Sequence, residues 1–428
     1  MTIQLPGPQI EKIFRLDCAI LAMLAAMETN GVHVDTAQLK TLDIALQGEI
    51  DQFRFQITPH AWTGFNPGSP DQVAELLFGT LHLQPGKKTS SGVRYTTDDK
   101  TLERLKHDHP VIPLLQEFRE VSKLHGTFVT GILAALDSES RVHTSLRHAS
   151  VVSGRLSSGD PINLQTIPTE SERGKLIRLA FRVKDGMQMG VADLSQIELR
   201  VLADFTHDPV MVDAFKQGQD LHLKTAAEIS GTPYSQITKA HPLRYPSKRF
   251  NFGMAYGISD EGLKDQLAMQ GIVWTVEEVA KFRKEWFRVY QQVRPAMEVV
   301  WAYTRRHGYV VDTWGRPRRL PGIWSDSPRI RSESERQAFN HVIQGGAAGI
   351  IKKIMARLWQ ETEAMENKVR TFILWLLQVH DELLFEMPAC IDPKPVMGWV
   401  LDVMRTTVEL SVPVFGDGKM AMAWGEAK

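Results

Sequence analysis

The sequence predicts an α+β protein, in which helices fill most of the chain and a few strands carry acidic residues. Apolar residues recur at helical spacing over residues 8–58, 101–136 and 211–306. Alternating or continuous apolar segments at 187–193 and 371–387 indicate strands instead. Strands and helices do not alternate regularly, so a repeated strand–helix–strand fold is not expected. At 428 residues, the chain predicts roughly two to four packed subdomains rather than one core.

The N-terminal part is predicted to be helical with one interruption. Asn30-Gly31 and a short extended segment, Val32–Val34, break the helical pattern of residues 8–58. Residues 59–100 are rich in Gly, Pro, Ser and Thr, which predicts loops around one short helix, Pro70–Phe78.

The middle of the chain moves from helix to strand. Ser69 is a suitable N-cap for the short helix that follows it, and residues 101–136 are helical again. The polar segment Arg141–Ser158 predicts extended structure. Met187–Asp193 is predicted to be a strand, and Gln196–Phe205 to be an amphipathic helix directly after it.

The C-terminal half is predicted to be mainly helical and to end in a hairpin. Helices dominate from 211 to 306, and Glu333–Glu366 carries one or two more. Thr371–Met387 alternates in the manner of two strands joined by a tight turn. Two of the predicted strands thus end at acidic residues.

The composition is that of a globular protein, with 43% hydrophobic and 23% charged residues. Cys18 and Cys390 are the two cysteines, so a disulfide framework and a C-x-x-C zinc cluster are both excluded. We therefore expect a reducing, cytoplasmic location, in a bacterium or in a cell infected by a virus.

One N-terminal segment resembles an export signal. Cys18–Met27 is apolar and follows Lys12 and Arg15, but it is much shorter than the roughly 20 residues that span a membrane. Asp17 interrupts the basic flank, and the apolar pattern continues into the next helix. A buried helix is the preferred interpretation, and no membrane partner is expected.

The formal net charge is zero, so any nucleic-acid contact must come from local charge. Tyr303–Arg331 contains seven arginines and four interleaved aromatic residues against Asp312 and Asp326. This stretch is typical of either a nucleic-acid surface or a solvated loop, and it does not decide between them alone.

Acidic residues at the predicted hairpin turn suggest chemistry. Apolar runs flank Gln378, His380, Asp381 and Glu382, and a carboxylate among such neighbours is costly unless it is paired or bound to a metal. The alternative is an exposed polar turn. This segment alone leaves both interpretations open.

A second acidic position lies where the strand 187–193 ends. Asp193 should project from the sheet edge, and Glu198 follows on the next helix. Ser195 and Glu198 also fit a capping box, which would make Glu198 structural. Asp193 and Asp381 together suggest a divalent-metal site, because two or three carboxylates suffice for Mg²⁺, and two such ions about 4 Å apart promote phosphoryl transfer.

A basic and aromatic stripe could hold a nucleotide. Arg244, Lys248, Phe252 and Tyr256 are spaced by four residues and therefore share one face of a helix. The cations suit phosphates and the aromatic rings suit a sugar and a base, and His222 could donate to the same phosphates. An amphipathic surface helix is the alternative. The chain has no Walker-type or Gly-x-Gly-x-x-Gly loop that would offer another phosphate site.

These residues, in this order, resemble the motifs of family A (DNA polymerase I-like) DNA polymerases. The matching segments are Asp193–Arg200 with motif A, Arg244–Gly257 with motif B, Val379–Glu382 with motif C, Gly154–Ser158 and Asn163–Pro168 with the segment between thumb and palm, and Arg336, Asn340 and Gln344-Gly345 with the minor-groove stretch. The resemblance runs from about residue 10 to the end of the chain.

The resemblance implies a right-hand fold with an antiparallel-sheet palm, helical fingers and a helical thumb. The implied subdivision is an N-terminal helical segment joining the palm at residues 1–63, the thumb at 64–140, the palm with motif A at 141–215, the fingers with motif B at 216–328, and the palm with the minor-groove helix and the motif C hairpin at 329–428.

The resemblance also implies a role for each matching position in template-directed addition of deoxynucleotides. Asp193 and Asp381, with the Leu194 carbonyl, would bind two Mg²⁺ ions, for which Mn²⁺ could substitute, and Glu382 would be an auxiliary carboxylate. The nucleotide-binding residues would be Gln196, Glu198, His222, Arg244, Lys248, Phe252 and Tyr256. Among these, Lys248 would also be catalytic by protonating pyrophosphate, and Glu198 would exclude a 2′-hydroxyl. The residues implied to contact primer-template DNA are Arg155, Arg336, Asn340, Gln344 and His380.

Departures from the family pattern carry their own expectations. Leu194 replaces the usual Tyr, which should alter local packing and spare the chemistry. Pro246 predicts that the fingers helix begins near that residue and leaves Arg244 just before it. Phe252 in place of Tyr predicts poor use of dideoxynucleotides.

The chain has only about ten residues before the resemblance begins, so we expect no intrinsic proofreading exonuclease. A separate exonuclease or other replication proteins would then be partners of a monomer, and Met1 favours a short phage-like gene over a trimmed fragment. Two alternatives remain. A single-subunit RNA polymerase shares the fold but lacks the discrimination that Glu198 implies, and an inactive homologue that only binds DNA would have lost the metal carboxylates first. Copying of RNA templates also stays open.

Overall fold

The computed structural model describes residues 4–89, 92–169, 171–365 and 372–427. The chain packs as two units, which we describe separately. The first comprises Met1–Gly31, Ser145–Gly159 and Asp185–Ala421, and the second comprises Val32–Thr144, Asp160–Lys184 and Met422–Lys428. The mixture of helices with antiparallel strands confirms the α+β prediction. The division into palm, fingers and thumb stays a prediction.

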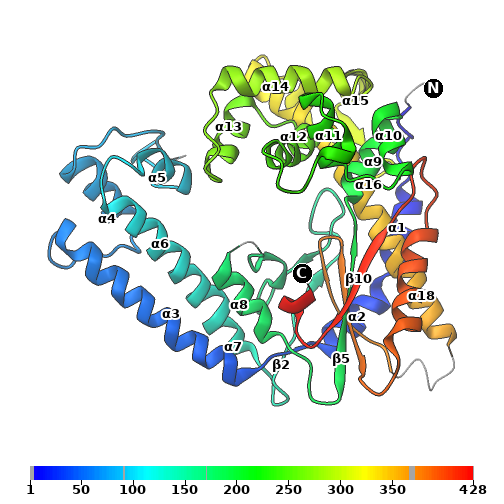
Figure 1. Ribbon diagram of the computed structural model, residues 1–428, viewed down its shortest axis with the longest axis horizontal. Coiled ribbons are helices and arrows are strands. Elements are labelled where there is room, and N and C mark those ends of the chain that lie inside the picture. Colours follow the sequence, from blue (N-terminus) through cyan, green and yellow to red (C-terminus); the bar gives the residue numbers. More distant parts are fainter. Residues whose placement is uncertain (1–3, 90–91, 170, 366–371, 428) are drawn as a thin grey trace. The chain divides into compact units, whose positions relative to one another are not determined.

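A four-stranded antiparallel sheet forms the centre of the first unit (Figure 1). Its strand order is β10-β5-β9-β8, with bounds Gly416–Ala421, Met187–Leu194, Glu382–Pro388 and Leu374–Val379. Strands β8 and β9 form the hairpin predicted from the sequence. Val379 pairs with Glu382, so the turn between the strands consists of two residues, His380 and Asp381. The predicted first residue of this hairpin, Thr371, lies outside the described residues. The predicted strand 187–193 is also confirmed.

Gly190 on β5 leaves room for the Phe385 ring of β9. It pairs with Phe385, and a methyl group placed on Gly190 would overlap the Phe385 ring. Replacing Gly190 with alanine should therefore destabilise the fold by about 2 kcal/mol through overpacking. The control is Gly398→Ala in a helix with open space around the position, which should instead stabilise by up to about 1 kcal/mol. Urea midpoints measure both changes, and equal midpoints for the two variants would contradict this prediction.

Helices pack around this sheet and extend beyond it. Their bounds are α1 (Ile10–Ala19), α2 (Leu21–Asn30), α9 (Ile197–Thr206), α10 (Pro209–Lys216), α11 (Leu221–Ser230), α12 (Arg244–Tyr256), α13 (Asp260–Ala268), α14 (Val276–Val289), α15 (Val293–His307), α16 (Pro328–Ala364) and α18 (Pro393–Thr406). Short strands β3 (Leu146–Arg147) with β4 (Ser157–Ser158), and β6 (Tyr309–Val311) with β7 (Pro317–Arg319), form two further ladders.

Local sequence signals explain where several of these helices begin. The carboxylates of Asp208 and Asp220 accept hydrogen bonds from the first backbone N–H groups of α10 and α11. Thr275 and Glu278 form a complete capping box at the start of α14. The apolar segment that resembles an export signal lies in α1 and α2, where Met23 and Leu24 are buried but Leu21 is exposed, so the segment is helical with one buried face. Among the described residues, no helix is long and apolar enough to cross a membrane.

The second unit is mainly helical. It contains β1 (Val32–His33), α3 (Thr36–Ile57), α4 (Pro70–Ala74), α5 (Asp99–Leu105), α6 (Val111–Lys123), α7 (Gly131–Ala135), β2 (Arg141–Val142) and α8 (Glu172–Ala180), with wide helical turns at Glu75–Thr80 and Leu124–Thr130. Helices α3 and α6 lie side by side (Figure 1). Arg173 on α8 joins them through ion pairs with Glu49 and Glu117. Ser69 caps α4 as predicted.

One predicted element is only partly confirmed. Within the predicted extended segment Arg141–Ser158, the strands are β2, β3 and β4, each two residues long. The rest is turns and loop. In one of the turns, the Gly154 N–H donates to the Val151 carbonyl at 2.8 Å.

Candidate active site

One pocket of the first unit gathers most of the residues singled out in the sequence. The site residues predicted from the sequence that line this pocket are Arg155, Asp193, Leu194, Gln196, Glu198, His222, Arg244, Lys248, Phe252, Tyr256, His380 and Asp381. Ile197, Asp220, Ala347, Ala348 and Ile351 complete the wall. Among the predicted residues, Glu382, Arg336, Asn340 and Gln344 do not line it. The pocket therefore brings together motif-bearing segments that are up to 226 residues apart, from Arg155 to Asp381.

The acidic wall forms where β5 ends beside the β8–β9 turn. The Leu194 N–H donates to the Asp381 carbonyl oxygen at 3.0 Å, which fixes the turn against the end of β5. His380 adopts a left-handed φ of 57°, the conformation that a two-residue hairpin turn requires. Asp193 and Asp381 are consequently held on neighbouring backbone segments.

Negative charge is concentrated on this wall. In the sheet, Asp193 pairs on one side with Glu382 and on the other with Asp417 of β10. Burial raises the pKa of the Asp381 carboxyl, the charges of Glu198 and Glu382 raise it further, and Arg155 opposes them. The anionic form of Asp381 is thus disfavoured by its surroundings, a situation that a bound cation relieves.

Glu198 has a different local role from the one a capping box would give it. The residue that precedes α9 is Gln196 rather than Ser195, and its left-handed φ of 52° leaves no side-chain cap. The capping-box alternative is therefore wrong, because Gln196 turns the chain sharply and takes the N-cap position without a side-chain cap. The Glu198 carboxylate accepts hydrogen bonds from Arg155 and from the Tyr256 hydroxyl.

Arg155, Glu198 and Tyr256 form one buried polar network on the pocket wall. Glu198 is 5% exposed, so its carboxylate depends on these two donors. Burial and the charge of Glu198 raise the pKa of Tyr256, which keeps its hydroxyl a donor. Gln344 of α16 also hydrogen-bonds Tyr256. The network fixes the Glu198 side chain beside the strand that carries Asp193.

A second buried network supports the segment that carries Arg155. The Asp17 carboxylate accepts from Arg316 at 2.8 Å and from Lys352 at 2.6 Å. Lys352 also donates to the His148 carbonyl at 2.9 Å, and Gly154 lies against the Arg316 side chain. Burial alone would raise the pKa of Asp17, but the hydrogen bonds from Arg316 and Lys352 lower it. Arg316, one of the seven arginines noted in the sequence, thus forms an ion pair inside the protein.

His341 of α16 gives this region a pH-dependent stability. Its imidazole hydrogen-bonds the Arg316 carbonyl at 2.9 Å, and burial lowers its pKa to about 4. Below its usual pKa of about 6.5, the unfolded chain therefore takes up a proton that the native state does not. The stability difference between wild type and His341→Gln should shrink by about 2 kcal/mol between about pH 7.5 and about pH 5.

Denaturant titrations of both proteins at the two pH values measure this change. The comparison with the variant is needed because burial raises the pKa of Asp312 to about 6, and protonation of that carboxyl favours the fold as the pH falls. A stability difference that does not vary with pH would show that His341 takes up its proton in the native state as readily as in the unfolded chain.

The opposite wall is the predicted stripe of α12. Lys248 and Arg244 lie towards its N-terminus, and the rings of Phe252 and Tyr256 lie parallel, with 15° between their planes. Phe252 also contacts the His222 ring at a centroid distance of 5.4 Å. All of these residues line the pocket, so the face of α12 that carries them is turned towards it.

The predicted start of α12 at Pro246 is wrong by two residues. The helix begins at Arg244, and the Ser247 N–H donates to the Leu243 carbonyl at 2.9 Å. Proline fits the third helical position because the first N–H groups of a helix have no partner within it. Arg244 is therefore part of the helix rather than displaced from it.

Arg244 also has an unused hydrogen-bond donor. Its Nε–H is buried and finds no acceptor among the described residues, and its guanidinium lies 3.8 Å from the Asp220 carboxylate. The Gln196 Oε1 acceptor is likewise buried and unsatisfied within the described part of the chain. Buried polar atoms of this kind indicate a polar ligand, and for Arg244 an anionic one.

The remaining predicted residues lie on α16, next to the pocket. Arg336, Asn340 and Gln344 are spaced by four and share one face of the helix. Arg336 lies against Gly257, which directly follows α12, and its guanidinium pairs with Glu333. Glu382, beside Asp193 in the sheet, is 2% exposed and does not reach the pocket surface.

Some residues of this region were not predicted. Asp417 reaches Asp193 from the last strand of the sheet, and its segment carries no motif that could have revealed it. Ala347 and Ala348 of α16 also line the pocket, and they follow Gly345 and Gly346 in the sequence. This run of four small residues was the sign in the sequence that another group could lie close to the helix at this point.

The match to known proteins agrees with this arrangement. Residues 36–426 match the family described as DNA polymerase family A. The chain belongs to DNA polymerase family A. It is 36% identical over 411 residues to DNA polymerase I of Caldicellulosiruptor bescii, covering 96% of this chain and 46% of that protein. It is 37% identical over 407 residues to DNA polymerase I of Deinococcus radiodurans, covering 95% and 41%.

A solved structure of a family A polymerase is also similar. It is the polymerase domain of Pol1 from M. smegmatis in complex with DNA primer-template and dNTP, with a TM-score of 0.87 and 33% identity. The match covers 96% of this chain and 70% of that one. The chain spans about half the length of the curated family A relatives it matches.

Proposed function

We propose that this chain is a template-directed DNA polymerase that adds deoxynucleotides to the 3′-hydroxyl of a primer. The observation that carries the proposal is the single pocket with two aspartates on one wall and the Arg244–Tyr256 stripe on the other. The M. smegmatis relative was solved with primer-template and dNTP, the ligands that these two walls suit. We accordingly propose primer-template DNA and dNTPs as the partners.

The residues of the acidic wall fit a divalent cation. Asp193, Asp381 and the Leu194 carbonyl offer only oxygen ligands, which Mg²⁺ prefers, and burial disfavours the Asp381 anion without a cation. Within the described residues, no three His, Cys, Asp or Glu side chains converge on one point, so part of the coordination would come from water and substrate. When bound, two Mg²⁺ ions would activate the attacking 3′-hydroxyl and neutralise charge on the leaving pyrophosphate.

The basic wall would bind the triphosphate. Lys248 and Arg244 supply two positive charges on one helix face, and the Nε–H of Arg244 is a further donor without an acceptor among the described residues. Lys248 would give a proton to pyrophosphate as it leaves. Phe252 and Tyr256 would pack against the sugar and the templating base, and Gln196 would contact the same nucleotide.

Glu198 would select the sugar. Its carboxylate is held by Arg155 and Tyr256, and it lines the pocket close to where the aromatic rings would place a ribose. A side chain held this firmly can exclude a 2′-hydroxyl on steric grounds. We therefore favour a DNA polymerase over an RNA polymerase.

The primer-template would be contacted by two groups of residues. Arg336, Asn340 and Gln344 present a polar face of α16 beside the end of α12, and Arg155 and His380 lie at the pocket edge. Polar side chains can hydrogen-bond minor-groove acceptors that are shared by different base pairs, which positions DNA without reading its sequence.

Primer extension tests the proposal directly. Purified protein is incubated with Mg²⁺, a labelled primer on a DNA template, and either four dNTPs or four rNTPs. We expect extension to the template end with dNTPs alone. DNA binding without extension in Mg²⁺ or Mn²⁺ would instead support the inactive homologue, and equal extension with rNTPs would support an RNA polymerase.

A further inference from the structure

The interior behind the basic wall contains a fully buried amide, Asn251. It lies on α12 between two residues of the stripe, and its side chain is completely shielded from solvent. The Trp286 indole N–H of α14 donates to one end of the amide at 2.8 Å. An indole N–H can only donate, so this end of the amide is the oxygen, Oδ1.

The other end of the amide is therefore the nitrogen, and it faces α11. Nδ2 lies 3.3 Å from the Leu221 carbonyl oxygen and 3.0 Å from Nδ1 of His222. The carbonyl can only accept, which supports the same orientation. Because an amide N–H can only donate, Nδ1 of His222 must present its lone pair. The proton of the neutral ring is then on Nε2.

His222 lines the pocket, and Nε2 is the ring atom left to meet a ligand there. The charged groups around the ring are Asp220 at the start of α11 and Arg244 and Lys248 on α12. Burial lowers the pKa of His222 to about 4, Asp220 opposes this shift, and Lys248 and Arg244 strengthen it. The ring is neutral at physiological pH.

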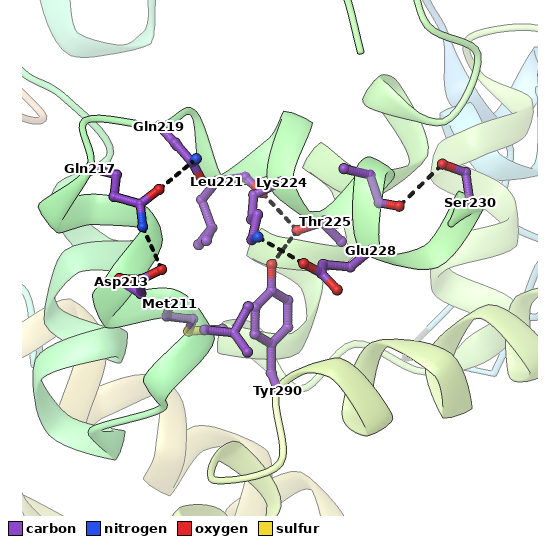
Figure 2. A network of polar contacts seen from close by, with 12 residues as sticks. Met211, Asp213, Gln217, Gln219, Leu221, Lys224, Thr225, Glu228, Ser230 and Tyr290 are labelled. Carbon is purple, nitrogen blue, oxygen red and sulfur yellow. Dashed lines mark hydrogen bonds and ion pairs between the residues drawn. The ribbon is translucent and has the colours of Figure 1, made fainter. Parts of the chain in front are cut away.

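The amide is held by neighbours that are equally buried. The Thr225 hydroxyl lies 3.0 Å from Asn251 Oδ1 and 2.7 Å from the Tyr290 hydroxyl. Figure 2 shows the Tyr290 ring directed at Thr225 across the gap between their segments. Asn251 thereby connects α11, α12 and the end of α14, and it has little freedom to reorient.

We propose that Asn251 is a positioning residue that holds His222 in the Nε2–H tautomer, so that the pocket meets an anionic ligand with a neutral hydrogen-bond donor beside the cations Arg244 and Lys248. The identity of that ligand, a nucleoside triphosphate, rests on the proposed function. The tautomer does not. In this arrangement, Arg244 and Lys248 attract the anion by charge, and His222 orients it by a directed hydrogen bond. The protonation of His222 Nε2, and hence its role as donor, does not change with pH above about 5.

The tautomer can be observed directly in the full chain. Protein labelled with ¹⁵N-histidine is studied by long-range ¹H–¹⁵N correlation NMR, and the signals of His222 are assigned by their loss in His222→Gln. We expect a protonated Nε2 and an unprotonated Nδ1 that persist from about pH 8 to about pH 5. A protonated Nδ1 at neutral pH in the wild type would overturn the proposal, whatever the variants do.

Asn251→Asp tests the cause. The carboxylate still accepts from Trp286, but it cannot donate to His222, so Nδ1 should become protonated and the titration midpoint of His222 should rise above about pH 6.5. Thr225→Val is the matched control, because it loosens the same network without changing the atom that faces His222, and its His222 spectrum should remain as in the wild type. An unchanged spectrum in folded Asn251→Asp would overturn the assignment.

The kinetic readout connects the tautomer to the ligand. In Asn251→Asp, the charged ring should make KM for dNTP fall with decreasing pH relative to the wild type, while Thr225→Val keeps the wild-type profile. Absence of polymerase activity would refute the proposed function and leave the NMR result intact. Conversely, an unchanged spectrum with active enzyme would refute the role of Asn251 alone.

Discussion

Replacing Asp381 with asparagine is expected to abolish primer extension without weakening the fold. The substitution removes a carboxylate that would bind the cation, and loss of several kcal/mol of charge stabilisation corresponds to a rate lower by about 10³-fold or more. Stability should be equal or higher, because burial and the charges of Glu198 and Glu382 already raise the pKa of Asp381 and disfavour its charged form. Asp193→Asn should lose activity to a similar extent.

Extension rates and melting temperatures, measured on the same preparations, check this result. Asp402→Asn is a suitable control because Asp402 is exposed on α18 and pairs with Arg405, away from the pocket. That variant should extend primers as the wild type does. Normal extension by Asp381→Asn would mean that the metal assignment is wrong, whereas loss of both activity and folding would leave a structural role for Asp381.

The second large effect is expected at Glu198. Glu198→Ala should raise the incorporation of ribonucleotides relative to deoxynucleotides by about 10²-fold, since the space that the carboxylate occupies becomes available to a 2′-hydroxyl. The Ala variant should also lose about 1–3 kcal/mol of stability, because Arg155 and Tyr256 lose their shared buried acceptor. Glu198→Gln keeps the volume and should retain most of the discrimination.

Single-nucleotide incorporation measures the ratio of kcat/KM for a dNTP and the matching rNTP. If the ratio in Glu198→Ala stays at the wild-type value, Glu198 does not select the sugar. If Glu198→Gln loses discrimination as fully as Glu198→Ala, the negative charge rather than the volume is responsible.

The sequence was most informative where chemistry and local structure depend on the same short segment. The hairpin that carries Asp381, the strand that ends at Asp193 and the stripe from Arg244 to Tyr256 were all predictable, because period and residue type are local properties. The errors were also local. Ser195 looked like an N-cap, but Gln196, in a left-handed turn, takes that position, and the helix starts one residue later than predicted.

What could not be predicted depends on distant pairing. Asp417 lies opposite Asp193 because β10 joins the sheet at that register, and the polar contacts of Asn251 require α11 and α14 to pack on α12. The periodicity of apolar residues along the chain does not show which distant strands pair or which helices pack together. Arg244 is a different case, a local error like the one at Ser195: a rule about proline predicted its displacement, whereas the folded helix includes both residues.

The ion pairs of Asp17 have a consequence for how this protein can be divided. The family match begins at residue 36, yet Asp17 neutralises Lys352, which is 1% exposed in the middle of α16. A recombinant fragment cut at the family boundary would leave that ammonium group buried without its counter-ion, at a cost of about 3–5 kcal/mol. A fragment that keeps the stability of this ion pair therefore includes α1, which lies outside the matched segment.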